Sequence, residues 1–289
     1  MMMNELLVGD VGGTNVRFAM AHRSAGRFAI DHFEKLEGDD FESFEDALVS
    51  YLEATGLKPD HACFALAGPV RDGEVLLTNR RWHVSARHVS QRFGIGNVNL
   101  VNDFAAMARA VPEYDSATFE TIRDGTPLEG APVLVAGPGT GFGVATLLGS
   151  DASTWHVLNG EGGHVAFSPR DETELELARI LLAKHGYVSN ELVASGSGLN
   201  AVHEAFCEMH GRPYQEIGPQ EMRRLADAGD EMFRSLIQLR ANTVMTAVGD
   251  LVLANGALGG VVLAGGVTDR ITDFLKSAEA CDRFVERGP

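Results

Sequence analysis

The stretch "LLVGDVGGTNVRFAM", residues 6–20, places a glycine turn between two apolar runs. Residues 5–9 predict a buried strand, and residues 16–21 predict a second strand that pairs with the first as a hairpin. The turn carries Asp10, two adjacent glycines and a Thr-Asn pair. Its glycines do not follow the G-x-G-x-x-G spacing of dinucleotide-binding folds, and no Lys-Ser/Thr pair marks a P-loop. The pattern therefore indicates a strand–turn–strand unit of a different kind.

The residue types in this turn favour contact with phosphate. Successive glycines allow positive φ angles and leave backbone N–H groups unshielded, and such turns form concavities that bind anions. Thr14 and Asn15 add side-chain donors, and Arg17 adds a cation. Asp10 would repel a bare phosphate, but a Mg²⁺ ion between the two removes this repulsion. The alternative is a hairpin turn that needs glycine only for its geometry.

Apolar runs and amphipathic runs alternate along the chain, which predicts a mixed α/β fold in two parts with a boundary near residue 112. The first part is predicted to contain strands at 28–36, 61–68 and 98–104 and helices at 43–56 and 105–111. The second part is predicted to contain a strand–turn–strand unit at 132–149, helices near 173–185, 197–210 and 230–255, and a strand within 259–267. A strand, a glycine turn and a strand open both parts, which suggests a duplicated domain.

One helix start is predicted in detail. Ser168, with Pro169 at the first helical position and Asp171, reads as an N-terminal box, and Gly186 ends the helix. The buried face of this helix is predicted to consist of Leu175, Ala178, Ile180, Leu181 and Leu182.

Composition limits the class of protein. The 289 residues are 45% hydrophobic and 22% charged, which predicts a packed core. A formal net charge of -16 argues against nucleic acid or an anionic membrane as the main partner, because both need a basic face. Three scattered cysteines without a C-x-x-C pair indicate neither a disulfide framework nor a cysteine zinc site, and they fit a reducing cytoplasm. No signal peptide or membrane span is predicted.

Two further glycine turns follow apolar strands. "GPGTGFG", residues 137–143, repeats the logic of the first turn, with Thr140 as a hydroxyl donor. "LAGGVTDR", residues 263–270, places Gly265 and Gly266 where a flat ring could lie against the backbone. The repetition of this pattern favours a polyphosphate ligand over three unrelated turns.

Asn102 and Asp103 end an apolar strand and precede a helix. Ligands of α/β folds bind at the carboxyl ends of strands. Asp103 is therefore a candidate general base that takes a proton from a substrate hydroxyl, as an Asp does in phosphoryl transfer. The alternative is that Asp103 is only the N-cap of the helix.

The segment "NGEGGHVAF", residues 159–167, puts Glu161 and His164 close together. No third ligand at metal spacing accompanies them, so hydrogen bonding to a polyol is favoured over metal binding. An ordinary surface or core histidine is the alternative for His164. Glu191 precedes a further Ser/Gly turn, and Asn79 is a short polar donor in "LTNRRW".

Seven stretches in this order resemble the bacterial glucokinases outside the ROK family, within the sugar kinase/Hsp70/actin superfamily: "LVGDVGGTNVR", "TNRRW", "VNDFAAMARAVP", "GPGTGFGVA", "NGEGGHVAFSP", "ELVASGSGL" and "GGVVLAGGV". The resemblance covers residues 5–270. ROK kinases usually carry a cysteine-rich zinc motif, which this chain lacks. The fold implied is α/β, an actin-like ATPase (ribonuclease H-like) fold of two domains, residues 1–112 and 113–289, with a cleft between them.

The resemblance implies an enzyme that uses ATP and Mg²⁺ to phosphorylate the 6-hydroxyl of glucose, feeds glycolysis and forms a homodimer. Asp103 resembles the catalytic base. The residues that resemble the glucose ligands are Asn102, Glu161, His164 and Glu191, with Asn79 as an addition. The residues that resemble the nucleotide site are Asp10 (on the metal side), Gly12, Gly13, Thr14 and Asn15, then Gly139, Thr140, Gly141 and Gly143, and Gly265 and Gly266 on the adenosine side.

Two alternatives to this function stay open from the sequence. The chain could be a kinase of another hexose, because nothing in the sequence fixes the pocket at the 2-position of the sugar. It could also be a sugar-sensing protein without catalysis on the same fold. In addition, chains of the glucokinase family continue after the equivalent of "FVERGP" with a strand and a helix that returns to the first domain. We expect this return segment to be absent from the present sequence.

Overall fold

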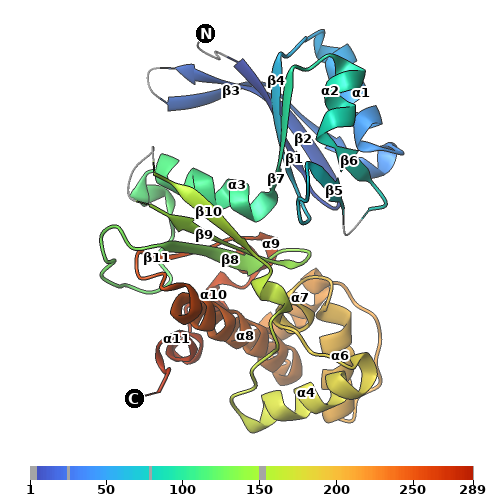
Figure 1. Cartoon of the computed structure of the whole chain (residues 1–289). Helices are drawn as coiled ribbons and strands as arrows, with labels where there is room; N and C mark the ends of the chain where they lie inside the picture. The colour runs from blue at the N-terminus through green and yellow to red at the C-terminus, as the bar shows by residue number, and fades with distance from the viewer. Residues whose placement is uncertain (1–4, 25–26, 78–79, 150–153, 289) are drawn as a thin grey trace. The chain divides into compact units, whose positions relative to one another are not determined.

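The structure is a computed structural model that describes residues 5–24, 27–77, 80–149 and 154–288. The chain divides into two compact units, which we call unit 1 (residues 1–113) and unit 2 (residues 114–289). Figure 1 shows the helices and strands of each unit. Within the described ranges, no helix is both long enough and apolar enough to cross a bilayer.

Unit 1 is built on a five-stranded sheet in the order β3-β2-β1-β4-β7. Its strands are β1 (Glu5–Val11), β2 (Asn15–Ser24), β3 (Arg27–Glu37), β4 (His61–Leu66) and β7 (Asn97–Asn102). The first three form an antiparallel meander, which confirms the predicted hairpin, and β4 and β7 run parallel to β1. The first glycine turn follows the carboxyl end of β1. It therefore lies at the same edge of the sheet as the carboxyl ends of β4 and β7.

The core of unit 1 is formed by side chains of the sheet and of the helices that pack on it. The helices are η1 (Gly38–Asp40), α1 (Phe44–Thr55), α2 (Ala86–Phe93), α3 (Asp103–Ala110) and η2 (Val111–Glu113), with a small hairpin of β5 (Glu74–Leu76) and β6 (His83–Ser85). α1 and α2 lie side by side against the sheet (Figure 1). Phe18, Phe44 and Phe64 are buried and meet edge to face, with ring centroids 5.0–6.0 Å apart.

Unit 2 contains a four-stranded sheet in the order β10-β9-β8-β11. Its strands are β8 (Val133–Pro138), β9 (Phe142–Leu148), β10 (His156–Gly160) and β11 (Gly260–Leu263). β10, β9 and β8 form an antiparallel meander, and β11 runs parallel to β8. This is the same order as β3-β2-β1-β4 in unit 1, so the repeated strand–turn–strand pattern of the sequence corresponds to a repeated topology.

The helices of unit 2 are η3 (Ser116–Thr118), η4 (Gly162–His164), α4 (Glu172–His185), α5 (Asn190–Ala194), α6 (Leu199–Met209), α7 (Pro219–Asp227), α8 (Glu231–Asn255), α9 (Gly266–Arg270), α10 (Thr272–Leu275) and α11 (Ala278–Val285). Asp230 caps α8 by accepting from the N–H groups of Met232 and Phe233. Residues 239–249 of α8 are buried on all sides. A helix that is surrounded in this way forms the centre of a core, and α4, α5, α6, α7, α10 and α11 pack around it or its neighbours.

The predicted extent of α4, near 173–185, agrees with the structure, but the predicted first helical residue, Pro169, was wrong. The helix begins at Glu172, because Asp171 is its N-cap and accepts from the Glu174 N–H at 2.8 Å. The buried face was predicted in part. Leu181 is buried and Ala178 and Ile180 pack against the core, as predicted, whereas Leu175 and Leu182 are half exposed and the buried Leu177 was missed.

Candidate active site

The first glycine turn consists of Gly12, Gly13 and Thr14. It connects Val11, the last residue of β1, to Asn15, the first residue of β2. The Gly12 N–H donates to the Asn15 carbonyl at 3.0 Å, which closes the turn. The Gly13 and Thr14 carbonyls accept hydrogen bonds from neighbouring segments, whereas their N–H groups have no acceptor in the part of the chain that the structure describes. The Oδ1 atom of Asn15 is buried and also lacks a partner among the described residues. An unsatisfied polar group of this kind is typical of a site that a ligand or water completes.

Asp10 and Arg17 face each other across the first hairpin. They are paired residues of β1 and β2, and Arg17 Nη1 donates to Asp10 Oδ2 at 2.5 Å. Both side chains are about half exposed, at 41% for Arg17 and 51% for Asp10. The pair leaves Asp10 a second carboxylate oxygen, and one carboxylate is a sufficient protein contribution where phosphate oxygens and water complete a Mg²⁺ shell. Among the described residues, no group of three or more His, Cys, Asp or Glu side chains could hold a metal by itself.

Asn102 and Asp103 lie at the junction of β7 and α3. Asn102 is the N-cap of α3, since its Oδ1 accepts from the Ala105 N–H at 3.1 Å, and its Nδ2 donates to the Gly68 carbonyl at 3.3 Å. The alternative in which Asp103 is the N-cap is therefore wrong. Asp103 is the first helical residue, and its Oδ1 accepts from the N–H of Phe104 at 2.9 Å. A negative charge at this position is favoured by the helix dipole.

The second glycine turn connects β8 to β9 through Gly139, Thr140 and Gly141. The Gly139 N–H donates to the Gly141 carbonyl at 2.8 Å. The loop after α5 holds the turn from behind: Gly196 N–H donates to the Gly139 carbonyl at 2.9 Å, and Ser197 N–H donates to the Thr140 carbonyl at 3.0 Å. Within the described ranges, the Thr140 and Gly141 N–H groups have no acceptor, so the turn presents donors as the first turn does. Gly143 follows within β9 and pairs with Gly137.

Glu161 precedes the short helix η4, and His164 is its last residue. Glu161 Oε2 lies 3.9 Å from His164 Nε2, and both side chains are 62% exposed. The two glycines between them are buried because η4 packs tightly on β9. A Cβ atom on Gly163 would lie 2.2 Å from the Phe142 carbonyl oxygen, so only glycine allows this approach. The result is an exposed carboxylate and an imidazole on a rigid base.

Glu191 joins the η4 segment to the second glycine turn. It lies in α5, and its Oε2 accepts from the Phe142 N–H, directly after the turn, at 2.7 Å. The neighbouring Asn190 N–H donates to the Val165 carbonyl at 2.9 Å, which ties α5 to the end of η4. Unit 2 therefore brings together three predicted residues or segments: Glu161 with His164, Glu191, and the turn at 139–141.

The third glycine turn connects β11 to α9. Gly265 has φ of +99°, and a Cβ atom there would lie 2.5 Å from the Pro138 carbonyl oxygen. Gly266 begins α9, and nothing lies within 4 Å of a Cβ atom added there. The second and third turns are therefore neighbours at the ends of the parallel strands β8 and β11.

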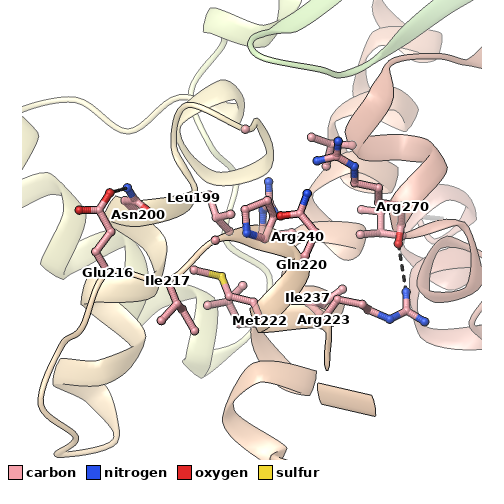
Figure 2. Close-up of a pocket in the computed structure, with 16 residues that line it drawn as sticks. Leu199, Asn200, Glu216, Ile217, Gln220, Met222, Arg223, Ile237, Arg240 and Arg270 are labelled. Carbon is pink, nitrogen blue, oxygen red and sulfur yellow. Dashed lines mark hydrogen bonds between the residues drawn. The ribbon is translucent and has the colours of Figure 1, made fainter. Parts of the chain in front are cut away.

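A cavity of about 630 Å³ is lined by residues that neighbour these turns: Gly196, which donates to the Gly139 carbonyl, and Val267, which follows Gly266. It reaches from Gly196, behind the second turn, to Val267 and Arg270 of α9. Figure 2 shows Asn200 and Glu216 at one end and Arg270 at the other, with Arg240 and Gln220 between them. The lining also includes apolar side chains: Leu199, Ile217, Met222, Leu236, Ile237, Val267 and Ile271. This size and this mixture of apolar walls with a few polar groups are typical of small-molecule sites.

Two arginines with structural contacts to the turns were not predicted from the sequence. Arg80 contacts the first turn, as described below, and Arg240 of α8 holds the loop behind the second turn. Arg240 is 4% exposed and donates from Nη2 to the Ala194 carbonyl at 2.8 Å and the Ser195 carbonyl at 2.7 Å. Its burial lowers the pKa of Arg240 to about 10. The available signal was an arginine with leucines, an isoleucine, a valine and a methionine around it in the predicted long helix, in "LIQLRANTVM", residues 236–245.

The predicted site residues are distributed over both units. Asp10, the first turn, Asn102 and Asp103 belong to unit 1, whereas Glu161, His164, Glu191 and the other two turns belong to unit 2. Asn79 lies outside the described residues. Each group is therefore a partial site with its own internal geometry.

Comparison with known proteins gives a consistent set of relatives. The profile of the family described as Glucokinase matches residues 7–289. A glucokinase of Caulobacter sp. (strain K31) is 37% identical over 283 residues, which cover 98% of this chain and 86% of the relative. A glucokinase of Salmonella typhi is 35% identical, over 98% of this chain and 87% of the relative.

Solved structures agree with the sequence comparison. The crystal structure of a glucokinase from an Antarctic psychrotroph superposes with a TM-score of 0.84 at 34% identity, over 99% of this chain and 90% of that chain. A glucokinase of Balamuthia mandrillaris, solved in complex with glucose, superposes with a TM-score of 0.77 at 22% identity, over 97% of this chain and 85% of that chain. The fold is thus a two-domain α/β sugar kinase fold, as predicted.

Proposed function

The chain belongs to the glucokinase family and is a glucose kinase, and from this premise we propose that it transfers the γ-phosphoryl group of ATP to the 6-hydroxyl of glucose. The observation that supports the mechanism is that Asn102 and Asp103 have different positions at the start of α3. Asn102 caps the helix, so the carboxylate of Asp103 is not needed as the cap and is placed at the carboxyl end of β7. Ligands of α/β folds bind at such strand ends.

Asp103 is the proposed general base. It would accept the proton of the 6-hydroxyl as that oxygen attacks the γ-phosphorus, while the bond between this phosphorus and the β,γ-bridging oxygen of ATP breaks. The products are glucose 6-phosphate and ADP. Phosphoryl transfer needs little covalent help from a protein, so positioning and charge stabilisation provide the rest of the catalysis.

The proposed sugar ligands are Asn102, Glu161, His164 and Glu191, with Asn79 as an expected addition. Glu161, His164 and Glu191 are supported by their geometry in unit 2, where an exposed carboxylate and imidazole lie on the segment joined to α5. A carboxylate can accept hydrogen bonds from two neighbouring hydroxyls, and an imidazole can donate or accept one. These groups suit a polyol.

The proposed nucleotide site consists of the three glycine turns. Gly12–Asn15 and Gly139–Gly143 offer backbone N–H groups without protein acceptors in the described ranges, which supports phosphate binding. Gly265 and Gly266 lie beside the cavity of about 630 Å³, which supports binding of the adenosine part there. Mg²⁺ would arrive with ATP and neutralise phosphate charge, and Asp10 is the carboxylate on that side.

The decisive experiment compares the wild-type protein with Asp103→Asn in an assay of ATP-dependent glucose 6-phosphate formation. We expect turnover to fall by several orders of magnitude in the variant while glucose still binds, because the base and its charge are removed and the shape is kept. Equal turnover in the two proteins would overturn the role of Asp103. Glucose binding by the wild type without any turnover would favour the non-catalytic sugar sensor.

The second candidate function is that of a kinase of another hexose. Initial rates with glucose, mannose, fructose and N-acetylglucosamine at equal concentrations distinguish it from a glucose kinase. A kcat/KM for any of the other sugars above that for glucose would favour the second candidate. We also propose a homodimer, as the resemblance implies. Sedimentation equilibrium at micromolar concentration tests the dimer, and a single species near 31.0 kDa would contradict it.

A further inference from the structure

Arg80 lies against the back of the first glycine turn. Its Nε donates to the Gly13 carbonyl at 2.7 Å, and its Nη2 lies 3.3 Å from the Thr14 carbonyl oxygen. The same Nη2 donates to Asp39 Oδ1 at 2.8 Å. The side chain of Arg80 is 9% exposed, whereas that of Asp39 is 89% exposed. The contact to the Gly13 carbonyl is therefore the more shielded one, whereas the bonds to Thr14 and Asp39 are exposed. The ion pair with Asp39 is open to solvent and weak.

The surroundings of Arg80 fit the guanidinium closely. Its Cζ lies 5.0 Å from the centroid of the Trp82 ring, which is buried. Gly38 is also close to the guanidinium, since a Cβ atom added there would lie 2.5 Å from the Arg80 Cζ. The Gly38 N–H also donates to the Thr14 carbonyl at 2.9 Å. Trp82 and Gly38 thus both lie against the guanidinium, and we call the space that they leave for it the Arg80 slot.

This arrangement determines which groups the turn can offer to a ligand. With the carbonyl oxygens of Gly13 and Thr14 held by Arg80 and Gly38, neither oxygen is available to repel an anion, and the N–H groups of the turn keep one orientation. The guanidinium also adds a positive charge behind these N–H groups. A charge in a partly desolvated position acts more strongly than one in water.

We infer that Arg80 is a positioning residue for phosphate: it fixes the first glycine turn in the orientation that binds the phosphates of the nucleotide. The inference rests on the proposed function, because it needs the turn to be a phosphate site. Arg80 acts through the turn and is not assigned a contact with the reacting atoms. Its loss should therefore weaken binding of the nucleotide without weakening binding of the sugar.

The first experiment measures steady-state kinetics for Arg80→Ala, Arg80→Lys and Arg81→Ala. Arg81 is the matched control, because it is the adjacent residue, carries the same charge and is exposed. For Arg80→Ala we expect the KM for ATP to rise about tenfold and kcat to fall, with the KM for glucose within about twofold of wild type, the loss of one charge-assisted contact being worth roughly one decade. Lys should restore part of the ATP affinity, since it keeps the charge but not the fork of donors.

The second experiment uses the Arg80 slot itself. Gly38→Ala adds a methyl group where the guanidinium lies, so it should displace Arg80 and raise the KM for ATP as Arg80→Ala does. In the double variant Gly38→Ala/Arg80→Ala, no guanidinium occupies the space of the added methyl group. We therefore expect the KM for ATP of the double variant to be no higher than that of Arg80→Ala alone. A purely additive double variant would mean that Gly38 does not act through Arg80 and would count against the inference.

The outcomes separate this inference from the proposed function. No glucose 6-phosphate from the wild type or from Arg81→Ala means that the proposed function has failed. Active wild type with an unchanged KM for ATP in Arg80→Ala overturns the inference alone. A lower melting temperature in Arg80→Ala without a selective change in the KM for ATP also overturns it, because Arg80 would then be structural only. Isothermal titration with ADP checks the affinity change independently of turnover.

Discussion

The first and second glycine turns occupy the same place in sheets of the same strand order, yet they are held in different ways. In unit 1, a side chain contributes to holding the turn: Arg80 donates to the Gly13 carbonyl at 2.7 Å, beside the backbone bond from the Gly38 N–H to the Thr14 carbonyl at 2.9 Å. In unit 2, backbone holds the turn: Gly196 and Ser197 donate to Gly139 and Thr140 at 2.9 and 3.0 Å. Both supports occupy the carbonyls and leave N–H groups for a ligand.

The difference teaches where each turn is vulnerable. The support in unit 1 is the Arg80 guanidinium, whose bonds to Thr14 and Asp39 are exposed, together with the Gly38 N–H. The loss of Arg80 should therefore affect the site more than the core. The support in unit 2 is a loop whose preceding carbonyl, that of Ser195, accepts from the buried Arg240 at 2.7 Å. A change at Arg240 should therefore act on the stability of the whole unit.

The largest effect on stability is expected for Arg240→Met. The variant leaves the carbonyls of Ala194 and Ser195 buried without their donor, and each unsatisfied buried acceptor costs about 1–3 kcal/mol. We expect a loss of about 3 kcal/mol in the free energy of unfolding, against about 1 kcal/mol for Arg80→Met. Urea denaturation followed by circular dichroism measures both.

Arg234→Met is the control for Arg240→Met, because Arg234 is an exposed arginine on the same helix, α8. Its effect should stay within about 0.5 kcal/mol. An equal loss for Arg240→Met and Arg80→Met would remove the contrast between a core support and a surface support.

A smaller effect is expected from a methyl group in each turn. A Cβ atom on Gly141 would lie 2.7 Å from Glu191 Oε2, whereas one on Gly12 would meet only the Asn15 carbonyl oxygen, at 3.6 Å. Gly141→Ala should therefore break the bond from the Phe142 N–H to Glu191 and cost about 1–2 kcal/mol of unfolding free energy, with weaker glucose binding. Gly12→Ala should cost less.

Thermal denaturation and glucose titration of Gly141→Ala and Gly12→Ala test this order. A larger loss of stability in Gly12→Ala than in Gly141→Ala would show that the first turn is the more tightly packed of the two, contrary to the comparison.

The smallest effect concerns the stability of the protein at acid pH. It depends on a buried histidine of unit 2, His203. His203 lies against the rings of Tyr214 and Phe233 at 5.2 and 5.3 Å, and burial lowers the pKa of its imidazole. The unfolded chain takes up a proton near the ordinary pKa of about 6.5 while the folded chain does not, so stability falls as pH decreases through that value. His203→Phe should flatten this fall.

The test is the free energy of unfolding of wild type and His203→Phe at pH 7.5, 6.5 and 5.5, with the exposed His156→Phe as the control for replacing a histidine. If the free energy of unfolding falls equally from pH 7.5 to 5.5 in wild type and in His203→Phe, the protonation of His203 does not cause the loss of stability.

Most of the fold was predictable because its signals are local. The glycine that ends α1, the apolar runs of β1 and β2, and the 25-residue α8 each leave a local pattern in the sequence. The start of α4 was missed because Ser168, Pro169 and Asp171 all suit a helix start, and only the bond from the Glu174 N–H to Asp171 selects one of them. The catalytic role of Asp103 and the sugar-binding roles of Glu161, His164 and Glu191 stay predictions.

The sequence alone determined the strand–turn–strand units at the first two glycine turns and the position of Asp103 at a strand end, because periodicity and turn residues act over a few neighbours. Only the tertiary structure decided that Asn102 and not Asp103 caps α3, and which donors hold the turns. Arg80 is 67 residues from Gly13, and Arg240 is 46 residues from Ala194. Contacts over such separations depend on how whole elements pack, and no local pattern in the sequence encodes them.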